Sequence, residues 1–203
     1  MNIDDLIKGT YDFRIDIGKL LDAFSKFEIS PKKRDRYSIT GLSVENGGNR
    51  GYDKIWNWNY ESPRHAIYMD APLGFALMYQ KKPCAAVTFG PLKSIESLDD
   101  EFLIYQLQGI RTEILDEDGL LINAKSTRSL YPLDYRALLV HVVSEFGRKN
   151  EISRIGIKSA DNVVLYSPVF TYEIAHRIYD EFAISNDFVK GTDGNWHKKI
   201  VPS

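Results

Sequence analysis

The chain has 203 residues, of which 43% are hydrophobic and 27% are charged, the composition of an ordinary globular protein. This length favours one well-buried domain over residues 1–203 and leaves little room for two. The formal net charge of −2 provides no general electrostatic basis for binding nucleic acid or an anionic membrane, so we expect neither as a partner.

The chain begins with a helical pattern. Residues 3–27 place apolar side chains at mostly helical spacing. Gly9-Thr10 and Gly18 interrupt this spacing, which predicts two short helices and a helical N-terminal extension over residues 1–30. The basic stretch "SPKKRDRYS" follows as an expected loop, which is either solvated surface or a phosphate contact.

Residues 45–65, "ENGGNRGYDKIWNWNYESPRH", are rich in glycine and asparagine and predict a long loop. Long loops with large apolar side chains either cover functional sites or pack on the core. Trp56 and Trp58 are therefore candidates for substrate contact, with packing as the alternative. His65 is a candidate general base, and its alternative is a surface or hydrogen-bonded histidine.

From residue 73 onward the pattern is that of short strands. "LGFALMYQ" and "PCAAVTFGPL" flank a Lys81-Lys82 turn and predict a hairpin. "EFLIYQLQGI" predicts a third strand, and the turn "DEDG" precedes a further strand, "LLINAKST". A helix is predicted from Pro132 through "LDYRALLVHVVSEFGRKN", because proline is frequent in a first helical turn.

The strand "ISRIGIKSA", the helix "TYEIAHRIYDEFAIS" and a strand pair around Asp193-Gly194 complete the chain. Helices and strands in this order predict an α/β fold of the α+β type, with helices packed on one mixed sheet over residues 65–200.

The order of elements resembles the Gcn5-related N-acetyltransferase fold over residues 65–200. "GFALMYQKKPCAAVTF" is similar to its central hairpin, "LDYRALLVHVVSEFGRKN" to its cofactor helix, "ISRIGIKSADN" to its fifth strand and "RIYDEFA" to its fourth helix. The resemblance implies an acyl-thioester donor such as acyl-CoA, and Tyr179 as the acid that protonates the leaving thiolate. The alternative for Tyr179 is packing against the sheet.

The family holds the coenzyme A pyrophosphate with a glycine-rich loop before the cofactor helix, where backbone amides contact the anion. This chain has "KSTRSLYPLD" at that point, without glycine. The donor phosphates would then be contacted by side chains, and the expected cofactor-binding residues are Lys125, Ser126, Thr127, Arg128 and Ser129.

A second, local resemblance is to the VirK-like proteins. It rests on "LGFALMYQKKPCAAVTF", "IYQLQG", "AKSTRSLYPLDYRALL" and "IYDEF". It implies a bacterial protein whose biochemistry is not settled by family membership.

Two further residues are candidates taken singly. Asn162, in "SADN", stands at the end of a predicted strand, a common ligand position in α/β sheets, and a turn-capping role is the alternative. Cys84, the only cysteine, is a nucleophile only beside a basic partner and is otherwise a buried small residue. No histidine or cysteine spacing matches a metal site.

The amino terminus predicts no secretion signal, because "MNIDDLIKG" has acids where a signal peptide carries positive charge. No apolar run approaches the roughly 18 residues of a membrane span. A lone cysteine is typical of a reducing compartment, so we expect a cytoplasmic protein.

Two functions remain open at this point. The first is an acyltransferase that moves an acyl group from an acyl-thioester to an unknown small-molecule or acyl-carrier substrate. The second is a non-catalytic ligand-binding or regulatory protein on the same fold.

Overall fold

The computed structural model describes residues 2–43, 70–93, 100–109, 114–115, 121–122, 133–163 and 170–200. A seven-stranded mixed sheet organises them, with the strand order β1-β2-β3-β4-β7-β9-β8. Its strands are β1 (Tyr37–Ser43), β2 (Leu73–Tyr79), β3 (Lys82–Lys93), β4 (Asp100–Gly109), β7 (Arg154–Ile157), β8 (Val189–Lys190) and β9 (Trp196–Lys199). Within this sheet, β4 and β7 are the parallel pair and the other neighbours are antiparallel. The predicted mixed α/β fold is confirmed.

The element order is the one that the acetyltransferase resemblance implies. The predicted hairpin is β2–β3, the helix after Pro132 is α4 (Tyr135–Lys149), and the closing strand pair is β8–β9. Of the further strand predicted over "LLINAKST", the described part is β6 (Leu121–Ile122), which pairs with β5 (Ile114–Leu115) in a separate two-stranded sheet. In the main sheet, β4 is the parallel neighbour of β7.

Two helices precede the sheet, as predicted, and a third short one was not expected. Side-chain caps set their starts: Asn2 accepts from the Asp4 amide before α1 (Ile3–Asp12), and Asp16 accepts from the Lys19 amide before α2 (Ile17–Phe24). The break falls between these helices, and Gly9 lies inside α1. Part of the basic stretch forms α3 (Pro31–Arg34), which begins with proline at its first position. The next strand, β1, was also not predicted.

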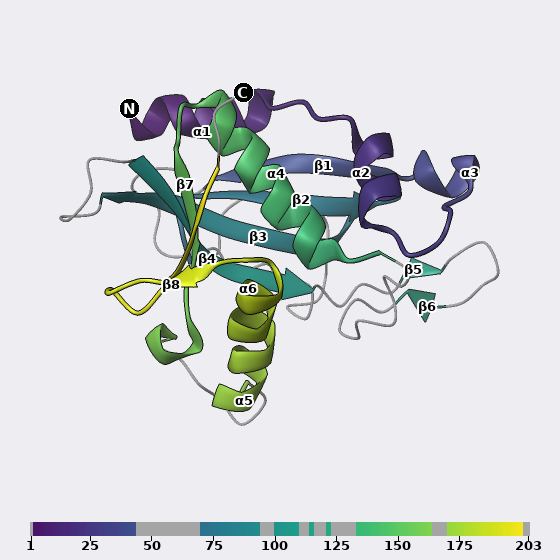
Figure 1. Cartoon of the computed structure of the whole chain (residues 1–203). Coiled ribbons are helices and arrows are strands. Elements are labelled where there is room, and N and C mark those ends of the chain that lie inside the picture. The colour runs from purple at the N-terminus through teal and green to yellow at the C-terminus, as the bar shows by residue number, and fades with distance from the viewer. Residues whose placement is uncertain are drawn as a thin grey trace.

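Helix α4 lies across one face of the sheet, in front of β2 and β3 in Figure 1. Its fully buried Phe146 contacts the rings of Phe75 on β2, Phe89 on β3 and Phe102 on β4, with centroid distances of 5.4, 5.8 and 5.8 Å. Phe13, which follows α1, packs edge-on against the same ring at 5.4 Å. Aromatic packing thus joins three strands and the N-terminal helices to α4.

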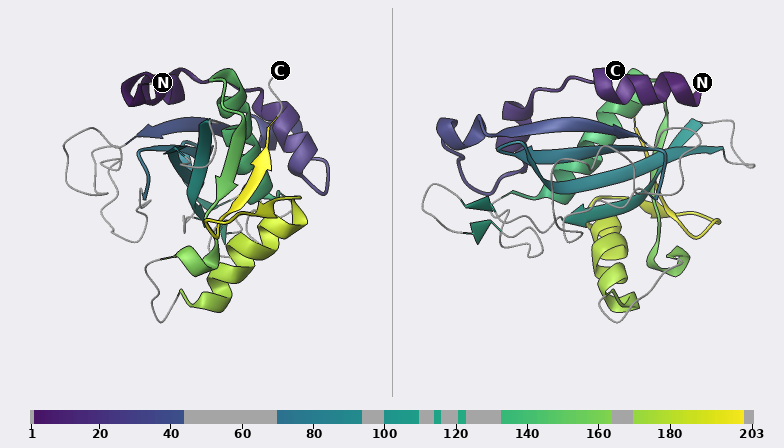
Figure 2. Two further views of the ribbon diagram at one scale, coloured as in Figure 1. Left: turned by 60° about the vertical axis from the view of Figure 1, so that its left-hand side comes forward. Right: turned by 180° about the vertical axis from the view of Figure 1, so that it is seen from behind.

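The C-terminal helix is one continuous run with an irregular middle. It consists of α5 (Tyr172–Ala175), a π-helical turn η4 (His176–Asp180) and α6 (Glu181–Ser185). Figures 1 and 2 show it below β4 and far from α1, and Arg136 at the start of α4 lies over the Phe182 ring of α6, 5.4 Å from its centre. A short 3₁₀ turn, η3 (Ala160–Asn162), follows β7. Among the described helices, none has the length and apolar character that a membrane span requires.

Candidate functional site

Strands β4 and β7 separate part-way along their length. Their parallel pairing ends at Ile104 opposite Ile157, and the Lys158 amide donates to the Ile104 carbonyl at 2.9 Å. Strand β4 continues to Gly109, while β7 stops. Figure 1 shows β4 running away from the end of β7. Within the described part of the chain, residues 106–109 pair with β3 and not with β7.

A β-bulge lies at the point where the strands separate. Thr88 pairs with Gln106 and Phe89 with Ile104, so Tyr105 is the additional residue on β4. A bulge increases local twist and bends the strand that carries it, and bulges are frequent beside active sites. The bend therefore explains why β4 leaves β7 immediately after Ile104.

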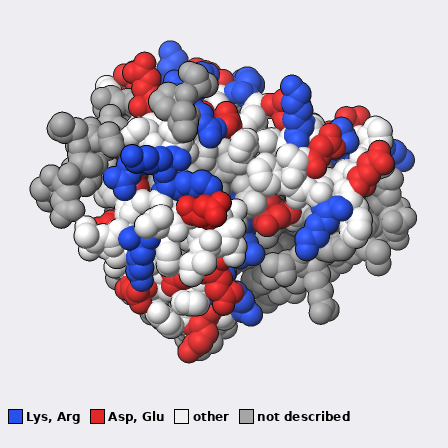
Figure 3. Space-filling view, viewed as in Figure 1, with Lys and Arg blue, Asp and Glu red and all other residues white. Residues whose placement is uncertain are grey.

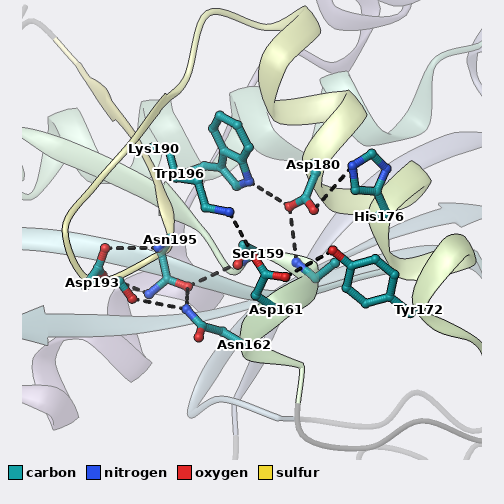
Figure 4. A network of polar contacts seen from close by, with 11 residues as sticks. Ser159, Asp161, Asn162, Tyr172, His176, Asp180, Lys190, Asp193, Asn195 and Trp196 are labelled. Carbon is teal, nitrogen blue, oxygen red and sulfur yellow. Dashed lines mark hydrogen bonds and ion pairs between the residues drawn. The ribbon is translucent and has the colours of Figure 1, made fainter.

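A buried carboxylate anchors the C-terminal helix to the end of β7 (Figure 4). Asp180 is 3% exposed, and its Oδ1 accepts from the Ala160 amide at 3.1 Å and from Trp196 Nε1 at 2.7 Å. His176 Nε2 lies 3.9 Å from Oδ2 of the same carboxylate. Charge-assisted hydrogen bonds are among the stronger ones. Asp180 thus ties η4, η3 and β9 together beside the opening.

An asparagine pair joins η3 to the turn between β8 and β9. Asn162 Nδ2 donates to Asn195 Oδ1 at 2.8 Å and to the Asp193 carbonyl at 3.2 Å. Asn195 also accepts from the Ser159 amide at 3.3 Å. Gly194 has φ +81°, the left-handed conformation that glycine adopts readily, and Asn162 lies against it. The turn is therefore fixed by side-chain amides from the end of β7.

Three further residues of the network in Figure 4 are exposed to solvent, namely Asp161, Tyr172 and Lys190. Asp161 accepts from Lys190 Nζ at 2.8 Å and from the Tyr172 hydroxyl at 3.0 Å. Hydrogen bonds from Lys190 and Tyr172 hold the pKa of Asp161 below its ordinary value. Exposed ion pairs of this kind contribute little to stability.

A buried ionic cluster crosses the sheet below the opening. Glu101 on β4 has a fully buried side chain, and its Oε1 lies 2.5 Å from Nδ1 of His197 on β9. His197 Nε2 lies 2.8 Å from Asp193 Oδ1. Strand β7 runs between β4 and β9, and a Cβ at Gly156 would meet Glu101 Oε1 at 2.6 Å. The absence of a side chain at Gly156 lets the glutamate reach across the intervening strand.

The cluster favours a charged His197. Its hydrogen bond with Glu101 raises the pKa of His197 most strongly, partial burial opposes this, and the Asp193 hydrogen bond adds to the increase. Burial acts to raise the pKa of Asp193, but hydrogen bonds from His197 and Asn195 outweigh it and lower that pKa. An imidazolium that donates through both nitrogens is a structural cation held between two carboxylates.

The predicted site residues fall into two groups. Tyr179 lies in η4 with a buried ring, 5% exposed, in the same hydrophobic cluster as Phe182 and Phe188. Asn162 lies at the end of η3, where its amide makes the turn contacts above. The catalytic role of Tyr179 and the substrate-binding role of Asn162 stay predictions. The remaining predicted residues, Trp56, Trp58, His65, Lys125, Ser126, Thr127, Arg128 and Ser129, lie outside the described residues.

Cys84 is buried, and its sulfur donates to the Leu77 carbonyl at 3.2 Å. Burial raises the pKa of its thiol to about 12, although its own amide and that of Ala85 act in the opposite direction. A thiol with this pKa carries almost no thiolate at neutral pH and is a poor nucleophile. Cys84 is therefore a small core residue, the alternative stated for it above.

Asp180 and the Glu101–His197 pair were missed from the sequence. The local signal for Asp180 was its place directly after Tyr179 and two residues before Phe182 in a predicted helix. Glu101 and His197 are 96 residues apart, and no local pattern connects them. Among the described residues, no group of three or more His, Cys, Asp or Glu side chains could hold a metal ion.

Charges on the described surface are mixed. Figure 3 shows basic and acidic side chains interspersed on the face that carries α4. A large field of a single sign, which would attract a polyanion, is not seen among the coloured residues of that face.

Comparisons with known proteins find similarity at the level of three-dimensional structure. No protein-family model and no curated protein sequence matches the chain. One similar structure is the aminoglycoside acetyltransferase meta-AAC0020 from an uncultured soil metagenomic sample, in complex with sisomicin. It is 14% identical, with a TM-score of 0.38, and the match covers 75% of this chain and 88% of that one.

Two further structures are similar to a comparable degree. A mutant of the AtaT toxin bound to the C-terminus of the antitoxin AtaR is 11% identical, with a TM-score of 0.41 and coverage of 82% of this chain and 94% of that one. The ribosomal-protein-S18-alanine N-acetyltransferase from Escherichia coli is 16% identical, with a TM-score of 0.35 and coverage of 82% and 96%. Because these identities and TM-scores are low, the fold of this chain is defined by its own strand order and register.

Proposed function

We propose that this protein is an acyltransferase that uses an acyl-thioester donor, such as acyl-CoA, bound where β4 and β7 separate. The observation that carries the proposal is the separation of β4 from β7 beyond Ile104, which begins at the bulged Tyr105. An extended chain with amide groups can add to an exposed strand edge through hydrogen bonds to its backbone. The arm of an acyl-thioester carrier contains such amides, and its thioester would lie near the bulge.

In the proposed reaction, a nucleophilic atom of the acceptor attacks the thioester carbonyl carbon and the C–S bond breaks. Tyr179 donates its proton to the leaving thiolate, and the resulting tyrosinate receives the proton that the acceptor releases. Asp180, the next residue in η4, anchors this turn to Ala160 at the end of β7. A π-helical turn in a helix is frequently found at functional sites, which supports a special role for this segment.

The other predicted residues complete the proposal. Lys125, Ser126, Thr127, Arg128 and Ser129 would contact the donor phosphates with side chains, because this segment has no glycine-rich loop. His65, Trp56, Trp58 and Asn162 would contribute to the acceptor side. The single cysteine supports a reducing compartment such as the cytoplasm.

Binding and chemistry are tested separately. Thermal unfolding is measured with acetyl-CoA, longer acyl-CoA, free CoA and ATP, since a ligand that binds the native state raises Tm. The expected result is stabilisation by the acyl-CoA compounds and CoA but not by ATP. Arg128→Ala is expected to weaken this stabilisation, while Arg14→Ala, which changes an exposed arginine between α1 and α2, is the matched control.

Product formation is followed by mass spectrometry of acceptor mixtures with labelled acetyl-CoA. Tyr179→Phe is expected to lower turnover by about 10²–10⁴-fold with a small change in Tm. Full turnover in this variant would remove Tyr179 from the mechanism. Binding of acyl-CoA with no transfer to any acceptor would support a non-catalytic binding protein instead.

A further inference from the structure

Side chains, not strand partners, bind the backbone amides at the end of β7. Alternate amides of β7 face β4, and the last one that bonds to it is that of Lys158. The next amide on that side belongs to Ala160, and it donates to Asp180 Oδ1 at 3.1 Å. The Ser159 amide, between them, faces the other way and donates to Asn195 Oδ1 at 3.3 Å. Oxygens from the C-terminal helix and from the β8–β9 turn therefore hold this end of β7.

The acceptor of the Ser159 amide is itself fixed by a carboxylate. Asn195 is 9% exposed, and its backbone amide donates to Asp193 Oδ1 at 3.0 Å while its Nδ2 donates to Asp193 Oδ2 at 2.8 Å. A carboxylate accepts only, so it keeps Nδ2 on its own side and turns Oδ1 of Asn195 toward Ser159. Figure 4 shows Asn195 between Asp193 and the segment that contains Ser159.

The same carboxylate contacts His197. His197 Nε2 lies 2.8 Å from Asp193 Oδ1, and its Nδ1 lies 2.5 Å from Glu101 Oε1. A continuous chain of polar contacts thus runs from Glu101 on β4, through His197 on β9 and the β8–β9 turn, to Ser159 after β7. It begins and ends on the two strands that separate at the donor opening.

The two carboxylates that contact His197 differ in how well they tolerate its loss. The Glu101 side chain is fully buried, and its Oε2 has no hydrogen-bond partner, so among the described residues His197 Nδ1 is its hydrogen-bond donor. The Asp193 side chain is 41% exposed, so water can solvate it. A neutral imidazole has a single N–H, and an unpaired buried charge is costly, so this N–H stays with Glu101. Loss of the imidazolium proton therefore breaks the contact with Asp193.

Charged groups of both signs surround His197 in the described structure. They come from β4, the β8–β9 turn, β7 and β9 itself, and are Glu101, Asp193, Arg154 and Lys199. Its strand partner on β8 is the uncharged Val189. The cations act against a charge on His197, and partial burial does so as well, but the hydrogen bonds to Glu101 and then Asp193 outweigh them and raise the pKa of His197.

We propose that His197 is a positioning residue for the acyl transfer, and that its charged form, through Asp193 and Asn195, holds the end of β7 apart from β4. The inference rests on the proposed function, which places the donor at this opening. When His197 loses its proton, Asp193 turns to solvent, Asn195 is no longer fixed, and the Ser159 amide loses its acceptor. The opening then loses its defined shape, so donor binding weakens as pH rises above 6.5.

The first experiment needs no ligand. In ¹⁵N–¹H NMR spectra recorded from pH 6 to 10, the Ser159 amide signal is expected to shift with the same midpoint as the His197 ring. Asp193→Ala removes the link but leaves the contact between Glu101 and His197, so in this variant the Ser159 signal should no longer follow the ring. Asp12→Ala, which changes an exposed aspartate at the end of α1, is the matched control and should behave as the wild type.

Two results of this experiment contradict the inference. A Ser159 signal that stays constant while the His197 ring titrates overturns it. A Ser159 signal that follows the ring equally in wild type and Asp193→Ala overturns it as well, because the coupling would then not pass through the carboxylate.

The second experiment measures the Kd for acetyl-CoA by isothermal titration calorimetry at pH 6.5 and pH 9. The wild-type Kd is expected to rise between these values by about three- to tenfold, the effect of one lost hydrogen bond. Asp193→Ala should bind with the weaker Kd at both pH values and change by less than about twofold. A merely structural role of Asp193 would not remove the pH dependence, and Asp12→Ala should retain it.

The outcomes separate the two proposals. A wild-type Kd that is the same at pH 6.5 and pH 9, or an equal rise in wild type and Asp193→Ala, overturns this inference and leaves the acyltransferase intact. Failure of the wild-type protein to bind acetyl-CoA at either pH overturns the proposed function. The ligand-free Ser159 measurement then supports or overturns the positioning role of His197 by itself.

Discussion

Replacing Glu101 by glutamine tests the buried ionic cluster most directly. The change keeps the shape of the side chain but removes the charge that faces His197, whose side chain is 11% exposed. Removing one partner of a buried ion pair costs about 3–5 kcal/mol. In this variant, the partly exposed Asp193 alone would remain beside the charge of His197. For a chain of this size that cost corresponds to a fall in Tm of roughly 6–20 °C. We therefore expect a clear loss of stability at pH 5.5.

The loss depends on pH in a defined direction. The folded-state pKa of His197 is raised above its ordinary value of 6.5, so its stabilisation is fully present below pH 6.5 and is lost as pH rises through the folded value. Asp193 has a lowered pKa, so its contribution is present above its ordinary value of 3.8 and is lost as pH falls. Between pH 3.8 and pH 6.5, the stabilising contributions of His197 and Asp193 are therefore both fully present. The difference between wild type and Glu101→Gln should narrow to about 1 kcal/mol at high pH, where His197 is neutral.

Urea unfolding followed by circular dichroism at several pH values between 5 and 9 measures this difference. Glu181→Gln is the matched control: the same change at a carboxylate that is 59% exposed near His176 should shift stability by less than about 0.5 kcal/mol. A loss for Glu101→Gln that is equal at pH 5.5 and pH 9 would refute a charged His197 in the folded protein. A wild-type stability that increases from pH 6.5 to 8 would refute it as well.

Three further substitution or labelling experiments test the packing. Gly41→Ala should lower the free energy of unfolding in urea by about 1–3 kcal/mol, because its Cβ would overlap the carbonyl oxygen of Thr10 on α1. Gly9→Ala, whose Cβ would lie 3.5 Å from Cε2 of Phe146 and inside a helix, should be neutral or stabilising. Equal effects of the two substitutions would contradict the close approach of α1 and β1. Cys84, with a thiol pKa of about 12, should react with an aromatic disulfide reagent only after unfolding, and rapid labelling of the native protein would show that it is accessible. Trp196→Phe removes the 2.7 Å hydrogen bond to Asp180 and should lower the free energy of unfolding by about 1.5–3 kcal/mol, measured by urea unfolding followed by circular dichroism. An unchanged urea midpoint would mean that this bond is not formed in solution.

Local patterns predicted the elements whose signals lie within a few residues. The hairpin β2–β3 follows from two apolar runs with a lysine turn, and α4 from its periodic leucines and valines, although the helix begins at Tyr135 behind the Asp134 cap rather than at Pro132. Strand β1 was missed because it follows the basic stretch and carries polar Ser38 and Thr40 among its apolar residues. The run "LLINAKST" predicted a strand, and residues 121–122 form β6, but a short apolar run does not reveal its partner strand.

The site was less predictable than the fold. The opening between β4 and β7 depends on a register difference of one residue at Tyr105, and no residue in "EFLIYQLQG" distinguishes a bulge from a regular strand. The contacts of Asp180 with Ala160 and Trp196 come from segments 16 to 20 residues away. Such contacts appear only after the helix and the closing hairpin are placed on the sheet.

The parallel pair β4–β7 also has a consequence for the order of folding. Strands β2 and β3 meet through a tight turn, whereas β7 reaches β4 only after the chain has passed through the whole of α4. Closing a long loop carries an entropic cost before any contact stabilises it, so non-local pairing slows folding. The β2–β3 hairpin is therefore expected to form before β7 joins the sheet. The amide of Lys158, at the far end of this late pair, should exchange its hydrogen with solvent sooner than the amides between β2 and β3.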